Sequence, residues 1–78
     1  MPTVLRIGPY RFSFFSLDCE EPRHVHVVRE RMKLKVWLEP VRAGRNEGLK
    51  SAEVRRIVRL VDENHAFLIG KWNEFCNG

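Results

Sequence analysis

Two histidines that lie two residues apart, His24 and His26, are the side chains of this sequence best suited to chemistry. They lie in the segment 21–27 (EPRHVHV), which is rich in β-branched residues and has a proline at its entrance, where a strand tolerates one. Side chains at positions i and i+2 of a strand leave the same face, so the imidazoles should stand together. Imidazoles titrate near neutral pH and can serve as general base and general acid.

Arginines that could accompany these histidines precede them in the chain. The runs 3–7 and 10–16 are rich in β-forming residues and are separated by Gly8-Pro9, which fits a tight hairpin. The hairpin pairs Arg6 with Arg11 on one face, and like charges in that position favour an anion between them. A pair of arginines can hold a phosphate and stabilise the charge that develops on it. On the other face the expected pairs are Ile7 with Tyr10, Leu5 with Phe12, and Thr3 with Phe14.

The segments 23–30 and 33–39 read as two further strands. Leu34, Val36 and Leu38 alternate with polar positions, as in a half-buried strand. Val25 and Val27 should join them in the core, because burial of the apolar face sets the register. A turn near residues 31–32 then places the histidines opposite two candidate site residues: His26 opposite Trp37 and His24 opposite Glu39.

The remaining segments complete the predicted fold. Residues 17–22 read as an acidic loop, and residues 40–50 as a basic loop whose Arg42 and Arg45 could contact phosphate. Helical periodicity begins at residue 51, with Ser51 as the expected N-cap, and Asn64-His65 predicts a kink or two helices over 51–63 and 64–76. We therefore predict a single α+β domain over 1–78. It is a four-stranded antiparallel meander packed on one face by the C-terminal helices.

Composition narrows the class of protein. The net charge of +4 favours an anionic partner, either nucleic acid or an acidic protein. No apolar run is long enough to cross a membrane and no signal peptide is recognisable, so we expect a cytoplasmic protein. Cys19 and Cys76 are far apart and form no metal-binding pattern, so we expect two incidental thiols and no cofactor.

Three interpretations of the histidine pair remain open. The histidines can be polar residues on a solvated strand face, or they can act on a phosphate beside the arginines. Metal-independent ribonuclease chemistry needs a general base, a general acid and a cationic clamp, and Trp37 could add a stacking surface for a base. The third interpretation is a metal site completed by Glu21 or Glu39, although nearby arginines would repel a cation.

The sequence resembles a small bacterial family named domain of unknown function four-one-six-zero. The resemblance rests on residues 1–7 (MPTVLRI), 10–12 (YRF) and 37–38 (WL), and above all on the Glu-Pro-x-His-x-His-Val segment. The resemblance implies that the gene for this chain lies beside the gene for a second small protein. Such a pair looks like a toxin–antitoxin module in which this chain is the toxin. The site positions that match the family are Arg6, Arg11, Glu21, His24, His26 and Trp37.

We therefore expect a toxin that acts on RNA as a metal-independent ribonuclease. In this hypothesis His24 and His26 are base and acid, assisted by Glu39, and Arg6 and Arg11 hold the phosphate. The antitoxin encoded next to it would be its protein partner. The rival hypothesis is a non-enzymatic module that binds a protein or nucleic acid, for which the helix arginines Arg55, Arg56 and Arg59 would matter more.

Overall fold

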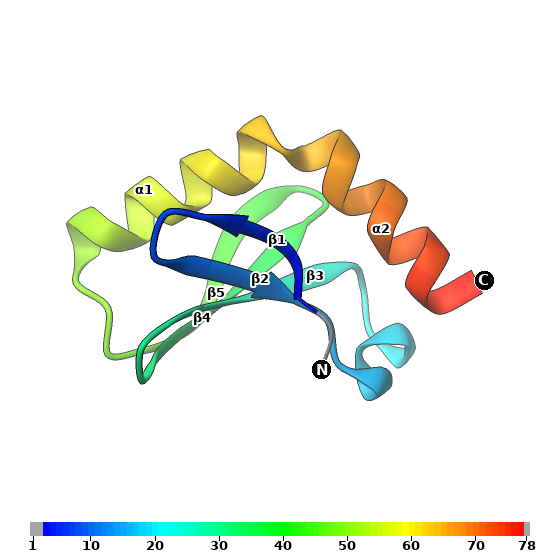
Figure 1. The fold of residues 1–78 in the computed structure, drawn as a ribbon, viewed down its shortest axis with the longest axis horizontal. Helices are drawn as coiled ribbons and strands as arrows, with labels where there is room; N and C mark the ends of the chain where they lie inside the picture. The colour runs from blue at the N-terminus through cyan, green and yellow to red at the C-terminus, as the bar shows by residue number, and fades with distance from the viewer. Residues whose placement is uncertain (1–2, 78) are drawn as a thin grey trace.

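An antiparallel sheet with two helices across one face forms the architecture of the computed structural model, which describes residues 3–77. Figure 1 shows helices α1 and α2 arching over the sheet, with a short 3₁₀ turn, η1, near the end of α2. In chain order the elements are β1 (Thr3–Ile7), β2 (Tyr10–Ser13), η1 (Ser16–Glu20), β3 (His24–Arg29), β4 (Met32–Leu38), β5 (Val41–Glu47), α1 (Ser51–Glu63) and α2 (His65–Asn77). The predicted α+β class and the pair of C-terminal helices are confirmed.

The sheet has five strands in the order β1-β2-β3-β4-β5, so the prediction of four strands is wrong. The additional strand, β5, occupies residues that were expected to form a basic loop. Its sequence, VRAGRNE, has little strand propensity of its own, but β4 offers it an unpaired edge. Tertiary pairing overrides a weak local preference of this kind.

Valine and leucine side chains of the central strands form the core beneath the helices. Val25 faces Val36 and Val27 faces Leu34, and all four side chains are fully buried. The helices close the core with Ile57, Val61, Leu68 and Trp72. Burial of each such side chain contributes about 1.5–3 kcal/mol to stability, which makes this face the main source of folding free energy.

The turn between β3 and β4 lies one residue earlier than predicted, at Glu30 and Arg31, with Glu30 at φ 55°. As a result His24 pairs with Trp37 and His26 with Lys35, and the predicted pairs of His26 with Trp37 and His24 with Glu39 are wrong. A slip of one residue would turn the apolar set to solvent, but a slip of two keeps it inside. The apolar pattern therefore could not distinguish these two registers.

The first hairpin follows the prediction near its turn and departs from it at its open end. Ile7 pairs with Tyr10, Arg6 with Arg11, and Leu5 with Phe12, as expected. Beyond that point a β-bulge places Thr3 opposite Ser13, so the predicted pairing of Thr3 with Phe14 is wrong. A bulge sets two residues of one strand against one of the other and shifts every later pair.

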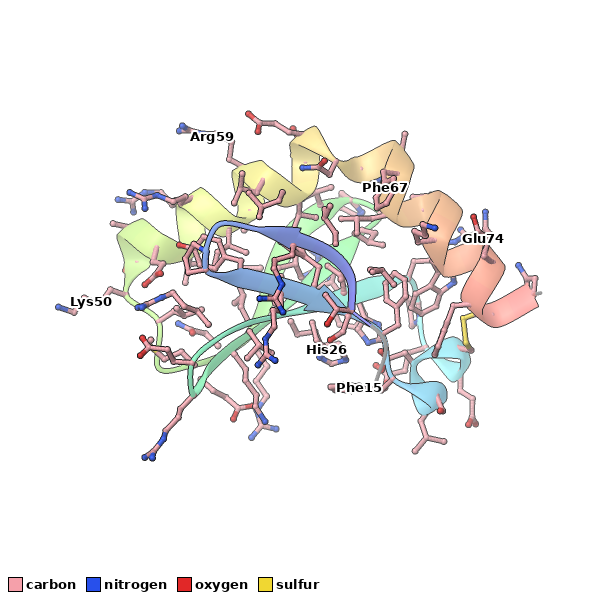
Figure 2. The ribbon with its side chains drawn as sticks, in the orientation of Figure 1. Phe15, His26, Lys50, Arg59, Phe67 and Glu74 are labelled. Atoms are coloured by element: carbon pink, nitrogen blue, oxygen red, sulfur yellow. A yellow bond between two sulfur atoms is a disulfide. The ribbon has the colours of Figure 1, made fainter. Side chains whose placement is uncertain are left out.

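Two details of the helices and cysteines also differ from expectation. The N-cap of α1 is Lys50, without a side-chain hydrogen bond, and Ser51 is already the first helical residue. Cys19 and Cys76, expected to be separate thiols, form a disulfide between η1 and the end of α2, and its yellow bond is visible in Figure 2. A sequence separation of 57 residues gave no hint of this contact, which the path of α2 creates. Within residues 3–77 no helix is long and apolar enough to span a membrane.

Candidate functional site

The carboxylate of Asp18 brings the two histidines of the motif together. Asp18 Oδ1 lies 3.0 Å from Nε2 of His24, and Oδ2 lies 3.1 Å from Nε2 of His26. The imidazole ring centroids are 5.0 Å apart and nearly perpendicular. The histidines thus share a face and meet one acid, so the prediction that they lie side by side is confirmed.

The 3₁₀ turn η1 places Asp18 beneath the start of β3. The backbone N–H of Phe15 donates to Asp18 Oδ2 at 2.7 Å, which fixes the carboxylate from the chain that leads into the turn. The next residue, Cys19, is bonded to Cys76 at the end of α2, so the disulfide holds the turn against the rest of the fold. Asp18 is only 6% exposed. Sequence reasoning placed it in a loop and missed it; the one available signal was an acid shortly before the His-x-His segment.

His24 is fully buried and has one ring nitrogen without a hydrogen-bond partner. Its Nδ1 lies 2.9 Å from the carbonyl oxygen of Pro22, and because a carbonyl can only accept, Nδ1 carries the proton. Its Nε2 makes no hydrogen bond within residues 3–77, although Asp18 Oδ1 is 3.0 Å away. Trp37 and Trp72 pack around the ring at centroid distances of 5.4 and 5.5 Å.

His26 is the accessible member of the pair. Its side chain is 21% exposed and stacks on the ring of Phe15 at 4.2 Å between centroids. Figure 2 shows both labelled residues on the side of the sheet away from the helices. Since Nε2 is directed at Asp18, Nδ1 is the ring nitrogen left to meet a ligand from solvent.

The environment of Asp18 favours its ionised form. Burial raises the pKa of this carboxyl. The hydrogen bond from the Phe15 amide and the two neighbouring imidazoles lower it by more, so the net pKa lies below its ordinary value. An ionised carboxylate therefore faces both histidines at neutral pH. Such a group can orient an imidazole or ligate a cation.

Cations surround the accessible part of this site on the open face of the sheet. Arg6 and Arg11 are paired across the first hairpin, as predicted, and both are exposed. Two shallow hollows share Phe15 and Lys33 in their linings; Arg11 lines one of them and His26 the other. None of the ion pairs within residues 3–77 involves Arg11 or Lys33.

The remaining predicted nucleic-acid contacts lie on the same face. Trp37 is partly exposed, with Lys35 4.4 Å and Arg42 5.8 Å from its ring centroid. Arg45 lines the hollow that contains His26. Lys35 is also paired with Glu21 at 2.7 Å, and this contact lowers the pKa of the Glu21 carboxyl. The positive charge of Lys35 is therefore already balanced within the protein.

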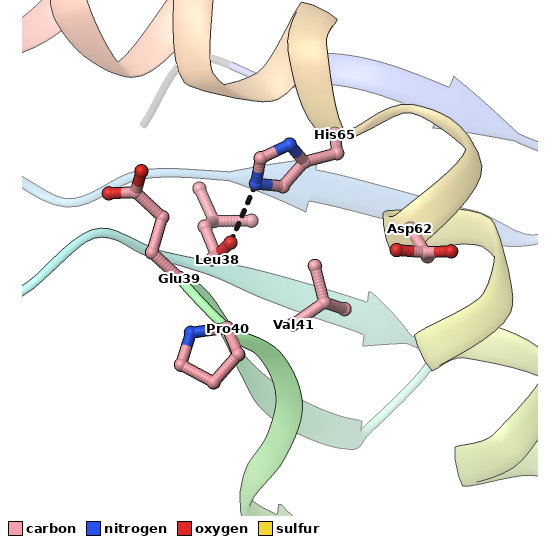
Figure 3. Close-up of a pocket in the computed structure, with 6 residues that line it drawn as sticks. All are labelled: Leu38, Glu39, Pro40, Val41, Asp62 and His65. Atoms are coloured by element: carbon pink, nitrogen blue, oxygen red, sulfur yellow. Dashed lines mark hydrogen bonds between the residues drawn. The ribbon is translucent and has the colours of Figure 1, made fainter.

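Glu39, predicted to join the histidine pair, lies in a different place. It forms an ion pair with Arg23 at 2.7 Å. Figure 3 shows it beside His65 in a hollow between the end of β4 and the start of α2. In that hollow Nε2 of His65 donates to the carbonyl oxygen of Leu38 at 2.7 Å. The shifted register therefore directs Glu39 to Arg23 and gives the histidines Asp18 as their acid.

Fold and site together define an α+β protein with a five-stranded sheet, a partly buried Asp-His-His cluster at that sheet, and cationic and aromatic side chains on the sheet face away from the helices. Residues 10–73 match the model of the family described as "Domain of unknown function (DUF4160)". The chain therefore belongs to that family, and the expected resemblance is confirmed to this extent. The comparison with curated proteins gives no match, and neither does the comparison with solved structures.

Proposed function

We propose that this protein binds single-stranded RNA on the open face of its sheet and that it is the toxin of a bacterial toxin–antitoxin pair. The observation that carries the RNA-binding part is the stack of Phe15 on His26 between two hollows whose linings include Arg11 and Lys33. The glutamates in these linings, Glu30 and Glu47, are each paired with an arginine. The toxin part is taken from what the family resemblance implies. Its partner would be a small antitoxin encoded by the neighbouring gene.

Charge and aromatic surface occur here in the combination that single-stranded nucleic acid requires. Arg11 and Lys33 are exposed and unpaired within residues 3–77, so they can meet phosphates without first leaving a protein carboxylate. Phe15 is 38% exposed although it is a large apolar side chain, and such a ring offers a base a stacking surface. Trp37 can supply a second one.

Cleavage of the bound RNA is the second candidate function, and the accessibility of His26 favours it. The proposed general acid–base pair needs both imidazoles at the same phosphate, but His24 is fully buried and only His26 reaches the surface. Asp18 orients His26 as a carboxylate orients a catalytic histidine, which leaves Nδ1 for proton transfer. His26 would take the proton of the attacking 2′-hydroxyl and return it to the leaving 5′-oxygen, so that one imidazole serves as base and then as acid. Arg11 would hold the phosphate, and His24 would act through Asp18 as a positioning residue.

RNA binding is tested by fluorescence anisotropy with a labelled single-stranded oligoribonucleotide across a salt series. The double variant Arg11→Glu/Lys33→Glu should bind more weakly and lower the salt slope by about 2, because two phosphates are no longer neutralised. Phe15→Ala should weaken binding about 5- to 150-fold, the range for one stacked base.

The matched control reverses the same number of charges on α1, where Arg55 and Arg59 are exposed and Figure 2 shows Arg59 on the far side from Phe15. Arg55→Glu/Arg59→Glu should bind RNA with the parent salt slope. If this control loses binding and the sheet-face variant does not, α1 is the binding surface and the proposal is wrong.

The toxin role is tested separately by growth on induction. Expression of the parent should arrest growth, and co-expression of the neighbouring small gene should restore it. Parallel assays of labelled RNA show whether the parent cleaves it and whether His26→Gln does not. If His26→Gln arrests growth as well as the parent, the acid–base role of His26 is wrong and toxicity comes from binding alone.

A further inference from the structure

We propose that Asp18, His24 and His26 form a binding site for one divalent transition-metal ion of the zinc type. This inference concerns the cluster itself and does not rest on RNA binding. Two imidazoles and one carboxylate are ligands that Zn²⁺ takes in proteins. The ligand atoms of the three residues all lie within 4.8 Å of one another.

The first argument is the unsatisfied nitrogen of His24. Its side chain has no solvent exposure, and its Nε2 has no hydrogen-bond partner among residues 3–77. Two other buried nitrogens share this status, Nε of Arg23 and Nε of Arg29, but guanidinium nitrogens have no lone pair for a metal ion. A buried polar atom without a partner is costly, and such atoms are rare in folded proteins. Because Nδ1 donates to the Pro22 carbonyl, the neutral ring has its lone pair on Nε2, on the side of Asp18. A metal ion is a partner to which an imidazole lone pair and a carboxylate can bind at the same time.

The outer contacts of the cluster match those of a metal site. Metal-ligating histidines usually donate their other ring N–H to a carbonyl or carboxylate, which fixes the ring orientation. His24 does this with Pro22, and Asp18 accepts the Phe15 amide N–H at 2.7 Å. A backbone hydrogen bond thus fixes the orientation of each of these two side chains. The disulfide at Cys19 fixes the turn that carries Asp18.

Two of the three separations between ligand atoms, those that involve Asp18, suit a shared ion. Ligands at about 2.0–2.1 Å from a metal are about 3.0 Å apart in octahedral and about 3.3 Å apart in tetrahedral geometry. Nε2 of His24 and Nε2 of His26 lie 3.0 and 3.2 Å from the same Asp18 oxygen, Oδ1. Since His26 is partly exposed, its ring can adjust as the ion enters.

Local charge does not oppose a cation at this position. The site contributes the side chain of Asp18, an acid, and the lysine opposite His26 in the sheet, Lys35, is paired with Glu21. Arg6 and Arg11, which were expected to repel a metal, lie on the first hairpin, where Arg11 pairs with Val28 at the other end of β3 from His24. Three protein ligands leave a further coordination position for water or a substrate oxygen, as in catalytic zinc sites.

The test uses Zn²⁺ alone on the disulfide-bonded, tag-free protein, because reduced cysteines or added histidines would bind zinc by themselves. After dialysis against EDTA, isothermal titration should show one Zn²⁺ per chain. Co²⁺ should bind in its place and give a visible absorption spectrum of nitrogen and oxygen ligation.

Asp18→Asn and His26→Gln should each weaken Zn²⁺ binding at least tenfold and abolish the Co²⁺ spectrum. These two variants test the site, because substitution of the buried His24 could unfold the protein. Circular dichroism verifies that each variant folds. Asp62→Asn and His65→Gln change an exposed aspartate and the third histidine, both outside the cluster, and should bind as the parent does. The proposal is overturned if the parent binds neither ion stoichiometrically, or if the control variants lose binding to the same extent.

Discussion

Two carboxylates of this protein, Asp18 and Glu53, each gather partners from distant parts of the chain, but those partners differ in their chemistry. One oxygen of Glu53, on α1, accepts a hydrogen bond from the hydroxyl of Tyr10 at 2.9 Å. The other accepts a hydrogen bond from Nη2 of Arg29 at 3.0 Å. Both oxygens therefore accept hydrogen bonds, and these stabilise the ionised carboxylate. Asp18 faces two imidazoles, and the nitrogen of His24 beside it has no hydrogen bond within residues 3–77.

The difference separates a structural ion pair from a candidate ligand site. The Glu53 cluster joins α1 to β2 and β3. Nε of Arg29 in this cluster also makes no hydrogen bond within residues 3–77, but it belongs to a guanidinium, which has no lone pair for a metal ion. The Asp18 cluster joins η1 to β3, and its buried nitrogen without a hydrogen bond, Nε2 of His24, belongs to an imidazole, which can ligate a metal ion. Perturbed carboxylates occur at both places, so a lowered pKa alone would not tell them apart.

Removal of the disulfide should have the largest effect, and it should act on the Asp18 end of the molecule. Closing a loop of 57 residues stabilises a protein by about 4 kcal/mol in the chain-entropy model. We expect Cys19→Ser/Cys76→Ser to lower the free energy of unfolding in urea by about that amount and to weaken Zn²⁺ binding. Unchanged zinc affinity in a folded double variant would show that η1 is held by other contacts.

Metal should stabilise the parent but not a protein that lacks the Asp18 carboxylate. Free Zn²⁺ at one hundred times its Kd raises the free energy of unfolding by about 2.7 kcal/mol, because it binds only the folded chain. The melting temperature of the parent should rise with zinc and return on addition of EDTA, whereas that of Asp18→Asn should not respond. Glu53→Gln should respond as the parent does, and the absence of a response there would remove the contrast between the clusters.

Removal of the tyrosine hydroxyl should have a smaller effect, confined to the Glu53 cluster. Tyr10 is 3% exposed, and its hydroxyl donates to Glu53. Tyr10→Phe deletes one hydrogen bond to a carboxylate that keeps Arg29, so we expect the free energy of unfolding to fall by about 1 kcal/mol. Urea unfolding measures it, and zinc binding should not change. A weakened zinc affinity would mean that the two clusters are coupled through the sheet.

The pH dependence of Glu53 should give the smallest signal. The hydrogen bond from Arg29, and then that from Tyr10, lowers the pKa of Glu53 below its ordinary value of 4.5. Because the folded pKa is depressed, this stabilisation is complete above about pH 4.5 and is lost as the pH falls through the folded value. The gap in melting temperature between the parent and Glu53→Gln, measured without metal, should therefore close on acidification from about pH 6 to pH 3. A gap that widens would contradict this sign.

Local patterns predicted much of the fold. Alternation of Val25 and Val27 with the histidines gave the face on which each lies, and the helical spacing from residue 51 gave both helices. Gly8-Pro9 gave the hairpin that pairs Arg6 with Arg11. These features depend on residues close in the chain, whose conformational preferences are read directly from their types.

The partners of the histidines were not predictable in the same way. Glu39 was expected beside His24, but a register slip of two residues preserves the apolar face, and the pattern cannot detect it. β5 was missed because its strand is specified by the open edge of β4 rather than by its own residues.

The sequence by itself determined that His24 and His26 share one face of a strand, that arginines are paired on the preceding hairpin, and that two helices cover the opposite face. The tertiary structure alone decided that η1 carries Asp18 to the histidines, that Cys19 meets Cys76, and that His24 is buried. The physical reason is that strand and helix periodicities are local. The meeting of a turn, a strand and a helix end is instead set by how the whole chain packs.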